Sequence, residues 1–389
     1  MDQYEKHGPA ARYLRRLSRG GAAAPGGALE AAPPESLSPD RADRAFERSI
    51  VSVERESGRP VDSRSREELD RLLRRDGRDA LERLRSDGPA AQLTSRHESA
   101  LEAIVEVDGS RPTLAVSDSD EIDPDDESLG DWRVVARRFA RQIALVASAV
   151  GRIDLDGKHT GTGFVVKEGL ILTNRHVLQQ LARSGAAGRW VFRGQPTITF
   201  DANPERGRER QFEIKKTVVR AGPAEIDFRA VDYDKLDFAV LECEVAQGRE
   251  FPTPLDLERD RDKIAERRPV FTVGYPADPG TYTYESDVLR KLFQHRYGVK
   301  RFSPGEIDRG LGRAAEGTGE TVFGHDATTL GGNSGSCVVD FGNDGRLVVG
   351  LHFAGVPKQA NFAHSSACLR GPLEGLGLGW KDWIQEDPR

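Results

Sequence analysis

The sequence has few cysteines, no long apolar run and no large excess of charge of one sign. Its three cysteines, Cys243, Cys337 and Cys368, are odd in number and widely spaced, which is poor material for a disulfide framework. A reducing cytoplasm is therefore the expected location. The charged start MDQYEKH is followed by no apolar run, so it predicts no secretory signal. The later apolar run at 143–150 is too short to span a bilayer, and no membrane partner is expected.

The charge balance excludes another class of partner. The chain of 389 residues carries 57 Lys and Arg against 63 Asp and Glu, a formal net charge of −6. This mild acidity argues against dedicated nucleic-acid binding, which needs a strong basic excess. The length indicates more than one structural unit, with ample material for a buried core.

Within the first 115 residues, the composition and the spacing of apolar residues change near residue 40. Residues 1–40 are rich in Gly, Ala, Pro, Ser and Arg without an apolar period, and they predict a disordered tail. Residues 41–115 carry apolar side chains at helical spacing and predict a small helical, candidate regulatory region. The spacing is clearest at Leu69, Leu72, Leu73, Ala80, Leu81 and Leu84. Gly77 is expected to divide this stretch into two helices.

Residues 116–130 are strongly acidic. Like charges at this density repel and stay solvated, so the segment is predicted to be a linker. A calcium loop is the alternative interpretation, but the glycine turn and terminal glutamate of such a loop are missing. Residues 131–146 then show the apolar spacing of a helix.

After residue 150 the pattern changes to short β-rich runs broken by Gly, Pro and Asp. These runs lie at 163–166, 190–192, 197–200, 217–219, 238–241, 270–273 and 347–353. Many short strands at such spacing indicate an all-β barrel or sandwich. The 239 residues after residue 150 are enough for two six-stranded barrels, and residues 131–389 are expected to form this domain.

One hexapeptide, GGNSGS at 331–336, places Ser334 between glycines just before an apolar run. A serine hydroxyl is a poor nucleophile at neutral pH, and it needs a base together with a third group that orients the base. His176 ends a strand-like run, and Asp237 begins another. Each residue alone has an ordinary structural explanation, in a loop, a half-buried site or a strand-start turn. Their combination in the order His, Asp, Ser predicts hydrolysis through a covalent intermediate.

The third role has competitors in Asp227, Asp232 and Asp234. Only Asp237 adjoins an apolar strand that would bury its carboxylate. The glycines supply a further requirement, a tight turn whose backbone N–H groups can face an oxyanion, and the expected donors are Gly332 and Ser334. This chemistry requires no metal and no cofactor.

Five short motifs together resemble the trypsin-like serine peptidases, nearest to their bacterial glutamyl-endopeptidase-like branch. They are GTGF at 161–164, TNRHV at 173–177, LDFAV at 236–240, GYP at 274–276 and the hexapeptide at 331–336. The resemblance covers about residues 145–385. It implies a mainly β, chymotrypsin-like double six-stranded barrel, with its active site between the barrels. It also implies an endopeptidase that acts on protein or peptide substrates.

The resemblance extends to a specificity pocket. The run GLHFAGVP at 350–357 is similar to the strand that lines the S1 pocket in that branch. There, histidine and threonine at the positions of His352 and Thr329 receive a P1 carboxylate, and Phe353 and Gly355 belong to the same substrate-binding set. This implies a preference for glutamate at P1. The alternative is that His352 is a packed strand histidine and that the pocket accepts another side chain.

Two departures from the family pattern affect regulation. About 150 residues precede the barrels. Either these residues are cleaved off, or the enzyme becomes active without a newly freed N-terminus. The N-terminal helices are then candidates to bind a regulatory partner and gate the enzyme, and a catalytically silent scaffold is the alternative function. Residues 277–320 resemble an insertion rich in aromatics, for which local packing is favoured over a substrate or partner surface. These aromatics are Tyr282, Tyr284, Phe293, Tyr297 and Phe302.

Overall fold

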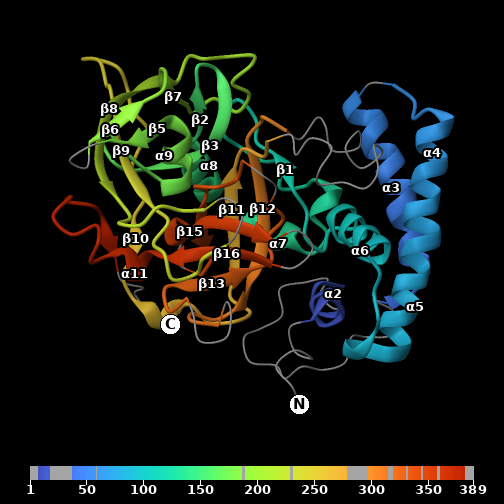
Figure 1. The fold of residues 1–389 in the computed structure, drawn as a ribbon. Coiled ribbons are helices and arrows are strands. Elements are labelled where there is room, and N and C mark those ends of the chain that lie inside the picture. Colours follow the sequence, from blue (N-terminus) through green and yellow to red (C-terminus); the bar gives the residue numbers. More distant parts are fainter. Residues whose placement is uncertain are drawn as a thin grey trace, which may run out of the picture.

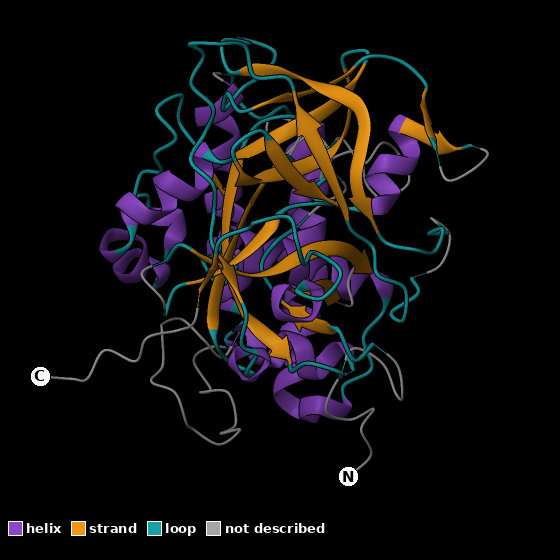
Figure 2. Cartoon of the chain, turned by 90° about the vertical axis from the view of Figure 1, so that its left-hand side faces the viewer, coloured by secondary structure: helices purple, strands orange, loops and turns teal. Residues whose placement is uncertain are grey.

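The computed structural model describes residues 8–17, 37–57, 59–185, 189–227, 231–277, 297–313, 319–329, 332–342, 345–356 and 360–381. Figure 1 shows a β-rich body with helices α3 to α6 gathered on one side of it. Figure 2 shows the strands of the body in two groups, one above the other. In the part of the chain so described, no helix is both long and apolar enough to cross a bilayer.

The first barrel closes through six antiparallel strands in the order β2-β3-β4-β9-β8-β7. Their bounds are β2 Val150–Leu155, β3 Lys158–Lys167, β4 Leu170–Thr173, β7 Pro196–Thr199, β8 Gln211–Ala221 and β9 Ala239–Cys243. Alternation explains the start of β8, where Phe212 and Ile214 are buried and Glu213 and Lys215 are exposed. Between β4 and β7 lie helix α9, Arg175–Leu181, and the hairpin of β5, Ala182–Ser184, with β6, Trp190–Phe192.

The second barrel has the strand order β14-β11-β12-β13-β16-β15 and closes because β14 also pairs with β15. Its bounds are β11 Pro269–Gly274, β12 Arg301–Arg309, β13 Val322–His325, β14 Cys337–Asp340, β15 Leu347–Val356 and β16 Ala360–Ser365. Three short strands extend the sheet, namely β1 Leu114–Ala115, β10 Leu257–Glu258 and β17 Trp380–Lys381, and helix α11, Ser366–Leu369, follows β16. Two closed six-stranded barrels confirm the predicted fold class.

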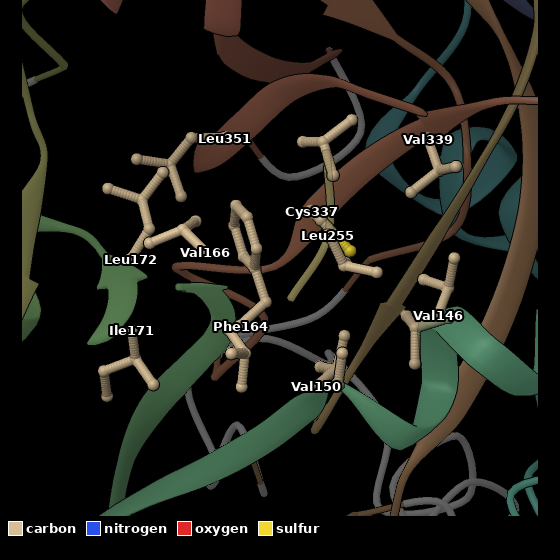
Figure 3. Close-up of a cluster of buried hydrophobic side chains, with 14 of the residues drawn as sticks. Val146, Val150, Phe164, Val166, Ile171, Leu172, Leu255, Cys337, Val339 and Leu351 are labelled. Carbon is tan, nitrogen blue, oxygen red and sulfur yellow. The ribbon is translucent and has the colours of Figure 1, made fainter. Parts of the chain in front are cut away.

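One apolar cluster joins the two barrels. Figure 3 shows Phe164 and Leu172 of the first barrel in the same cluster as Cys337, Val339 and Leu351 of the second. Burying a large apolar side chain contributes about 1.5–3 kcal/mol each. The shared core therefore fixes the two barrels against each other.

The N-terminal helices lie beside the second barrel. They are α2 Pro9–Leu17, α3 Asp40–Ser57, α4 Ser63–Leu69, a π-helical stretch Asp70–Asp76, α5 Gly77–Asp87 and α6 Ser95–Val107. They share their own buried cluster, against which Tyr297 packs. Strand β1 follows them and pairs with β12, which connects this region directly to the second barrel. The predicted helical region is thus present and forms part of the same body.

The prediction of a disordered tail over 1–40 is wrong for residues 9–17. Tyr13 and Leu17 of α2 are fully buried, and the Tyr13 hydroxyl donates to the Glu102 carboxylate at 3.0 Å. Composition averaged over forty residues hides one short helix whose stability comes from a distant partner. Residues 1–7 and 18–36 lie outside the described residues.

Gly77 does not divide two helices. Its backbone is helical, with φ −67° and ψ −42°, and the chain stays helical from α4 through the π-helical stretch into α5. A Cβ placed at this residue would lie 2.9 Å from Ile104 Cδ1 of α6. The glycine therefore permits close packing of two helices, and this packing offsets its low helix propensity.

The acidic segment is less solvated than its charge predicts. Asp120 and Ile122 are buried, and the Asp120 carboxylate accepts from Lys300 Nζ at 2.7 Å and from Arg210 Nη1 at 2.6 Å. Two cations offset the cost of burying this one carboxylate. The exposed acidic residues around it keep the predicted character.

Two further expectations need adjustment. The single helix expected over 131–146 is two helices, α7 Trp132–Arg138 and α8 Ala140–Ser148, separated at Phe139, whose ring packs on Phe341 at 5.6 Å. In the 277–320 stretch, the packing interpretation is confirmed for Tyr297 and for Phe302, which is buried in the barrel core. Tyr282, Tyr284 and Phe293 lie outside the described residues.

Candidate active site

Strand pairing brings His176 and Asp237 together. β4 pairs with β9, with Thr173 opposite Ala239. His176 follows β4 in the first turn of α9, and Asp237 lies two residues before the start of β9. The buried Asp237 carboxylate accepts from the His176 backbone N–H at 2.9 Å through Oδ1, and its Oδ2 lies 2.6 Å from the ring nitrogen Nδ1. Because an ionised carboxylate can only accept, Nδ1 carries the ring proton and Nε2 is left basic.

A second histidine holds Asp237 from the other barrel. The Asp237 backbone N–H donates to His364 Nε2 at 3.1 Å, and His364 Nδ1 lies 3.2 Å from the Thr321 hydroxyl. Burial lowers the pKa of His364 to about 4, so the ring is neutral and can accept this bond at pH 7. Sequence reasoning missed His364, because a lone histidine in a short strand carries no sign of a partner elsewhere in the chain.

Thr162 fixes the turn that carries Ser334. The Thr162 N–H donates to the Ser334 carbonyl at 2.8 Å, and its hydroxyl donates to the Gly332 carbonyl at 2.8 Å. The same hydroxyl accepts from the Tyr275 N–H at 3.2 Å, and the Thr162 carbonyl accepts from the Thr173 hydroxyl at 2.7 Å. The serine turn is thus held against the middle of β3 and the end of β4, next to the start of the helix that bears His176.

Glycine is required at two positions of this turn. Gly332 and Gly335 have φ values of 88° and 91°, which L side chains rarely adopt. A Cβ at Gly335 would lie 1.9 Å from the Thr162 carbonyl oxygen. The close approach between the turn and β3 therefore depends on this glycine.

The second barrel meets the same turn. The Gly335 N–H donates to the His352 carbonyl at 2.9 Å. Burial is the main cause that holds the pKa of His352 well below its usual range, and the nearby His325 and His176 lower it further. The serine turn, His176 and strand β15 therefore gather at one place between the barrels.

The proposed pocket residues form a connected group with one exception. His352 Nδ1 lies 3.1 Å from His325 Nε2, and the Thr329 hydroxyl donates to Asn361 Oδ1 at 2.6 Å. A Cβ at Gly355 would lie 2.8 Å from the same Asn361 oxygen, so Gly355 belongs to this group. His325 and Asn361 are paired residues of β13 and β16, and neither stands in a motif that would have predicted its place in the group.

Phe353 is the exception. Its ring stacks on His364 at a centroid distance of 4.2 Å, within a separate buried cluster with Val322 and Phe362. His352 instead contacts His325, so the two neighbouring rings have different partners. The structure does not bring the Phe353 side chain into the pocket group.

Cys337, close behind Ser334, is a packed core residue and not a second nucleophile. Cys337 is fully buried in β14, and burial raises the pKa of its thiol to about 12, so it stays protonated in the core. Within the described ranges, no group of three or more His, Cys, Asp or Glu side chains is arranged to hold a metal ion.

Solved structures that match this chain have low sequence identity to it. The active form of the Rv3671c protease from M. tuberculosis is 20% identical, with 62% of this chain and 87% of that chain covered and a TM-score of 0.39. A serine endoprotease from Yersinia pestis is 19% identical, with coverages of 62% and 64% and a TM-score of 0.36. Similarity at this level carries no weight in the assignment.

Sequence relatives are more informative. A probable serine protease of Lysobacter enzymogenes is 33% identical over 306 residues, which are 74% of this chain and 77% of that protein. Residues 161–351 match the family described as the trypsin-like peptidase domain. That range runs from the GTGF motif through the serine turn to β15, and so contains the geometry described above. The chain therefore belongs to the trypsin-like serine peptidases.

Proposed function

We propose that the protein is an endopeptidase that cleaves peptide bonds through an acyl-enzyme, with Ser334 as nucleophile, His176 as general base and Asp237 as the group that orients His176. The two-point contact between the Asp237 carboxylate and His176 is the observation that carries the proposal. It fixes both the ring position and the tautomer, which a base near a serine hydroxyl requires.

The proposed reaction needs only the triad residues, the peptide and water. Ser334 Oγ attacks the carbonyl carbon of the peptide while His176 Nε2 takes the hydroxyl proton. The C–N bond then breaks, and His176 gives the proton to the leaving amine. Water, deprotonated by the same nitrogen, attacks the acyl-enzyme and releases the carboxylic acid product with Ser334 regenerated.

The oxyanion formed in these steps needs hydrogen-bond donors. We assign this role to the backbone N–H groups of Gly332 and Ser334. No described residue accepts a hydrogen bond from either group, so both remain able to donate to substrate. The bonds from Thr162 to the carbonyls of the same two residues hold the turn, so that these donors are preorganised.

For specificity, we propose that the pocket prefers glutamate at P1. His325 and His352 are both neutral at pH 7, because burial lowers the pKa of His325 to about 4 and that of His352 well below its usual range. If His325 Nε2–H donates to His352 Nδ1, then His352 Nε2 carries a proton. That N–H would serve as a donor to a carboxylate, and the Thr329 hydroxyl would become a second donor once its proton turns from Asn361 Oδ1 to the substrate.

Labelling with a fluorophosphonate probe tests the chemistry. The wild type should be labelled and Ser334→Ala should not. Ser336→Ala is the matched control, because Ser336 is two residues away, fully buried and outside the proposed mechanism. Equal labelling of wild type and Ser334→Ala would refute the nucleophile, and a labelled enzyme with no turnover on a broad peptide library would favour a scaffold function.

A separate measurement tests the pocket. Sequencing the new N-termini in a digested proteome locates each cut and the residue before it. Glutamate should dominate at P1, and a spread of unrelated residues would refute the proposed preference while leaving the catalytic assignment untouched.

A further inference from the structure

Arg111, a buried arginine outside the barrels, forms an ion pair with a residue of the second barrel. Arg111 follows α6 in the N-terminal region, and its side chain is 1% exposed. Its Nε and Nη2 donate to the two carboxylate oxygens of Asp326 at 2.7 and 2.6 Å. Burial alone would raise the pKa of Asp326, yet Arg111 is the main reason that this pKa falls to about 2. The pair is therefore a bidentate ion pair without solvent access.

More contacts join the same two regions. Arg16 of α2 donates from Nη2 to the Asp326 carbonyl at 3.1 Å, and the Thr328 hydroxyl donates to the Arg111 carbonyl at 2.7 Å. Asp326 Oδ1 also accepts from the Glu306 N–H at 2.7 Å, so the carboxylate is held from β12 as well. Residues 326–328 are thus fixed largely by side chains and backbone of the N-terminal region.

The segment 325–329 alternates between two sets of partners. His325 contacts His352, the Ala327 carbonyl accepts from Asn361 Nδ2 at 2.8 Å, and Thr329 donates to Asn361. Asp326 and Thr328, the residues between them, contact Arg111. The side chains of this segment therefore contact two sets of partners, of which one belongs to the proposed pocket group and the other to the N-terminal region.

We propose that Arg111 is a positioning residue for the substrate pocket, and that the N-terminal helical region is a built-in activator that must be seated for substrate to bind. The proposal rests on the pocket assigned under the proposed function. The guanidinium and the carboxylate are both buried, and removal of either leaves the other without its bidentate partner, with only the weaker effect of Arg16 on Asp326 and of Glu306, 3.9 Å away, on Arg111. The pocket wall and the helical region are thereby coupled.

The test compares full-length variants by two measurements. A fluorophosphonate titration counts competent serines, and peptide hydrolysis gives KM per labelled site. Arg111→Met should keep most of its labelled sites, while KM for the best peptide substrate rises on the order of 100-fold, as expected for a displaced binding group. Arg111→Lys keeps the charge but loses the bidentate geometry. Its KM should lie between that of the wild type and that of Arg111→Met.

Arg268→Met is the matched control. It removes an arginine that directly precedes β11 and is 18% exposed, and that pairs with the fully buried Asp340 outside the 325–329 segment. A role confined to stability predicts that both Met variants lose labelled sites and keep the wild-type KM, and that result would overturn the proposal.

A second variant covers the case in which Arg111→Met does not fold. Thr328→Val removes only the hydroxyl bond to the Arg111 carbonyl, and KM should rise about 3- to 10-fold. An unchanged KM for Thr328→Val would refute the coupling. Activity or labelling that survives in Ser334→Ala would instead refute the catalytic assignment, so the two failures are distinguishable.

Discussion

Replacing Asp237 by Asn tests the orientation of His176 with almost no change in shape. The carboxylate provides two acceptors, one for the His176 backbone N–H at 2.9 Å and one for ring Nδ1 at 2.6 Å. An amide provides one acceptor and one donor group. If its oxygen serves the backbone N–H, its NH₂ faces Nδ1 and forces the ring proton onto Nε2, where it blocks the base.

The magnitude follows from this mismatch. Loss of one charge-assisted hydrogen bond costs about 1.5–3 kcal/mol. The wrong tautomer adds to this, and the same substitution in an equivalent triad lowers kcat by about 10,000-fold. We expect a loss of that order in kcat/KM at neutral pH, with a cooperative unfolding transition retained.

The assay is hydrolysis of a fluorogenic peptide chosen from a substrate screen, together with the rate of fluorophosphonate labelling. Asp232→Asn is the matched control, since Asp232 is a partly exposed aspartate close in sequence whose carboxylate pairs with Lys235 at 3.3 Å and accepts from the Asp234 N–H at 3.1 Å. The activity of this variant should stay within about twofold of wild type. A loss of less than about tenfold in Asp237→Asn, in a folded protein, would refute the proposed role of Asp237.

Three other substitutions probe the surroundings of the site. Thr162→Val leaves buried polar groups of the serine turn unpaired, so urea unfolding should show a loss of about 2–4 kcal/mol and kcat should fall; an unchanged kcat would contradict its role in holding the turn. His352→Leu should lower kcat/KM for a glutamyl substrate about 10- to 100-fold and leave an alanyl substrate nearly unchanged, and equal losses on both would count against the pocket. Stability should fall as pH drops from 6.5 to 4, because the pKa values of His325 and His364 are about 4 when folded, so the unfolded chain binds more protons there; each histidine contributes up to about 3 kcal/mol. His364→Gln should have a shallower slope in urea unfolding over that range, and parallel slopes would disprove this origin.

The barrels and the His–Asp pair were predictable because their signals are local. Alternating burial in strands such as β8 follows directly from the sequence, and both residues of the pair lie beside strands that the apolar runs identify. The register of β4 and β9 then brings them together without further information. The local sequence pattern was therefore sufficient to predict the position of a residue that lies beside a strand.

The supports of the site were not predictable in this way, because their partners are distant in the chain. His364 lies 127 residues from Asp237, Thr162 lies 170 from Gly332, and Arg111 lies 215 from Asp326. Each is an ordinary polar residue in its own segment. Helix α2 shows the same limit, because its burial depends on Glu102 and not on the composition around it.

The central claim is that hydrolysis passes through an acyl group on Ser334. Reaction with a slowly deacylated nitrophenyl ester, followed by peptide mapping in a mass spectrometer, tests it most directly. The account predicts a burst of nitrophenol that matches the number of labelled chains, with a single acyl group on Ser334 and no burst in Ser334→Ala. An acyl group on another residue, or peptide turnover without any trapped acyl group on Ser334, would contradict it.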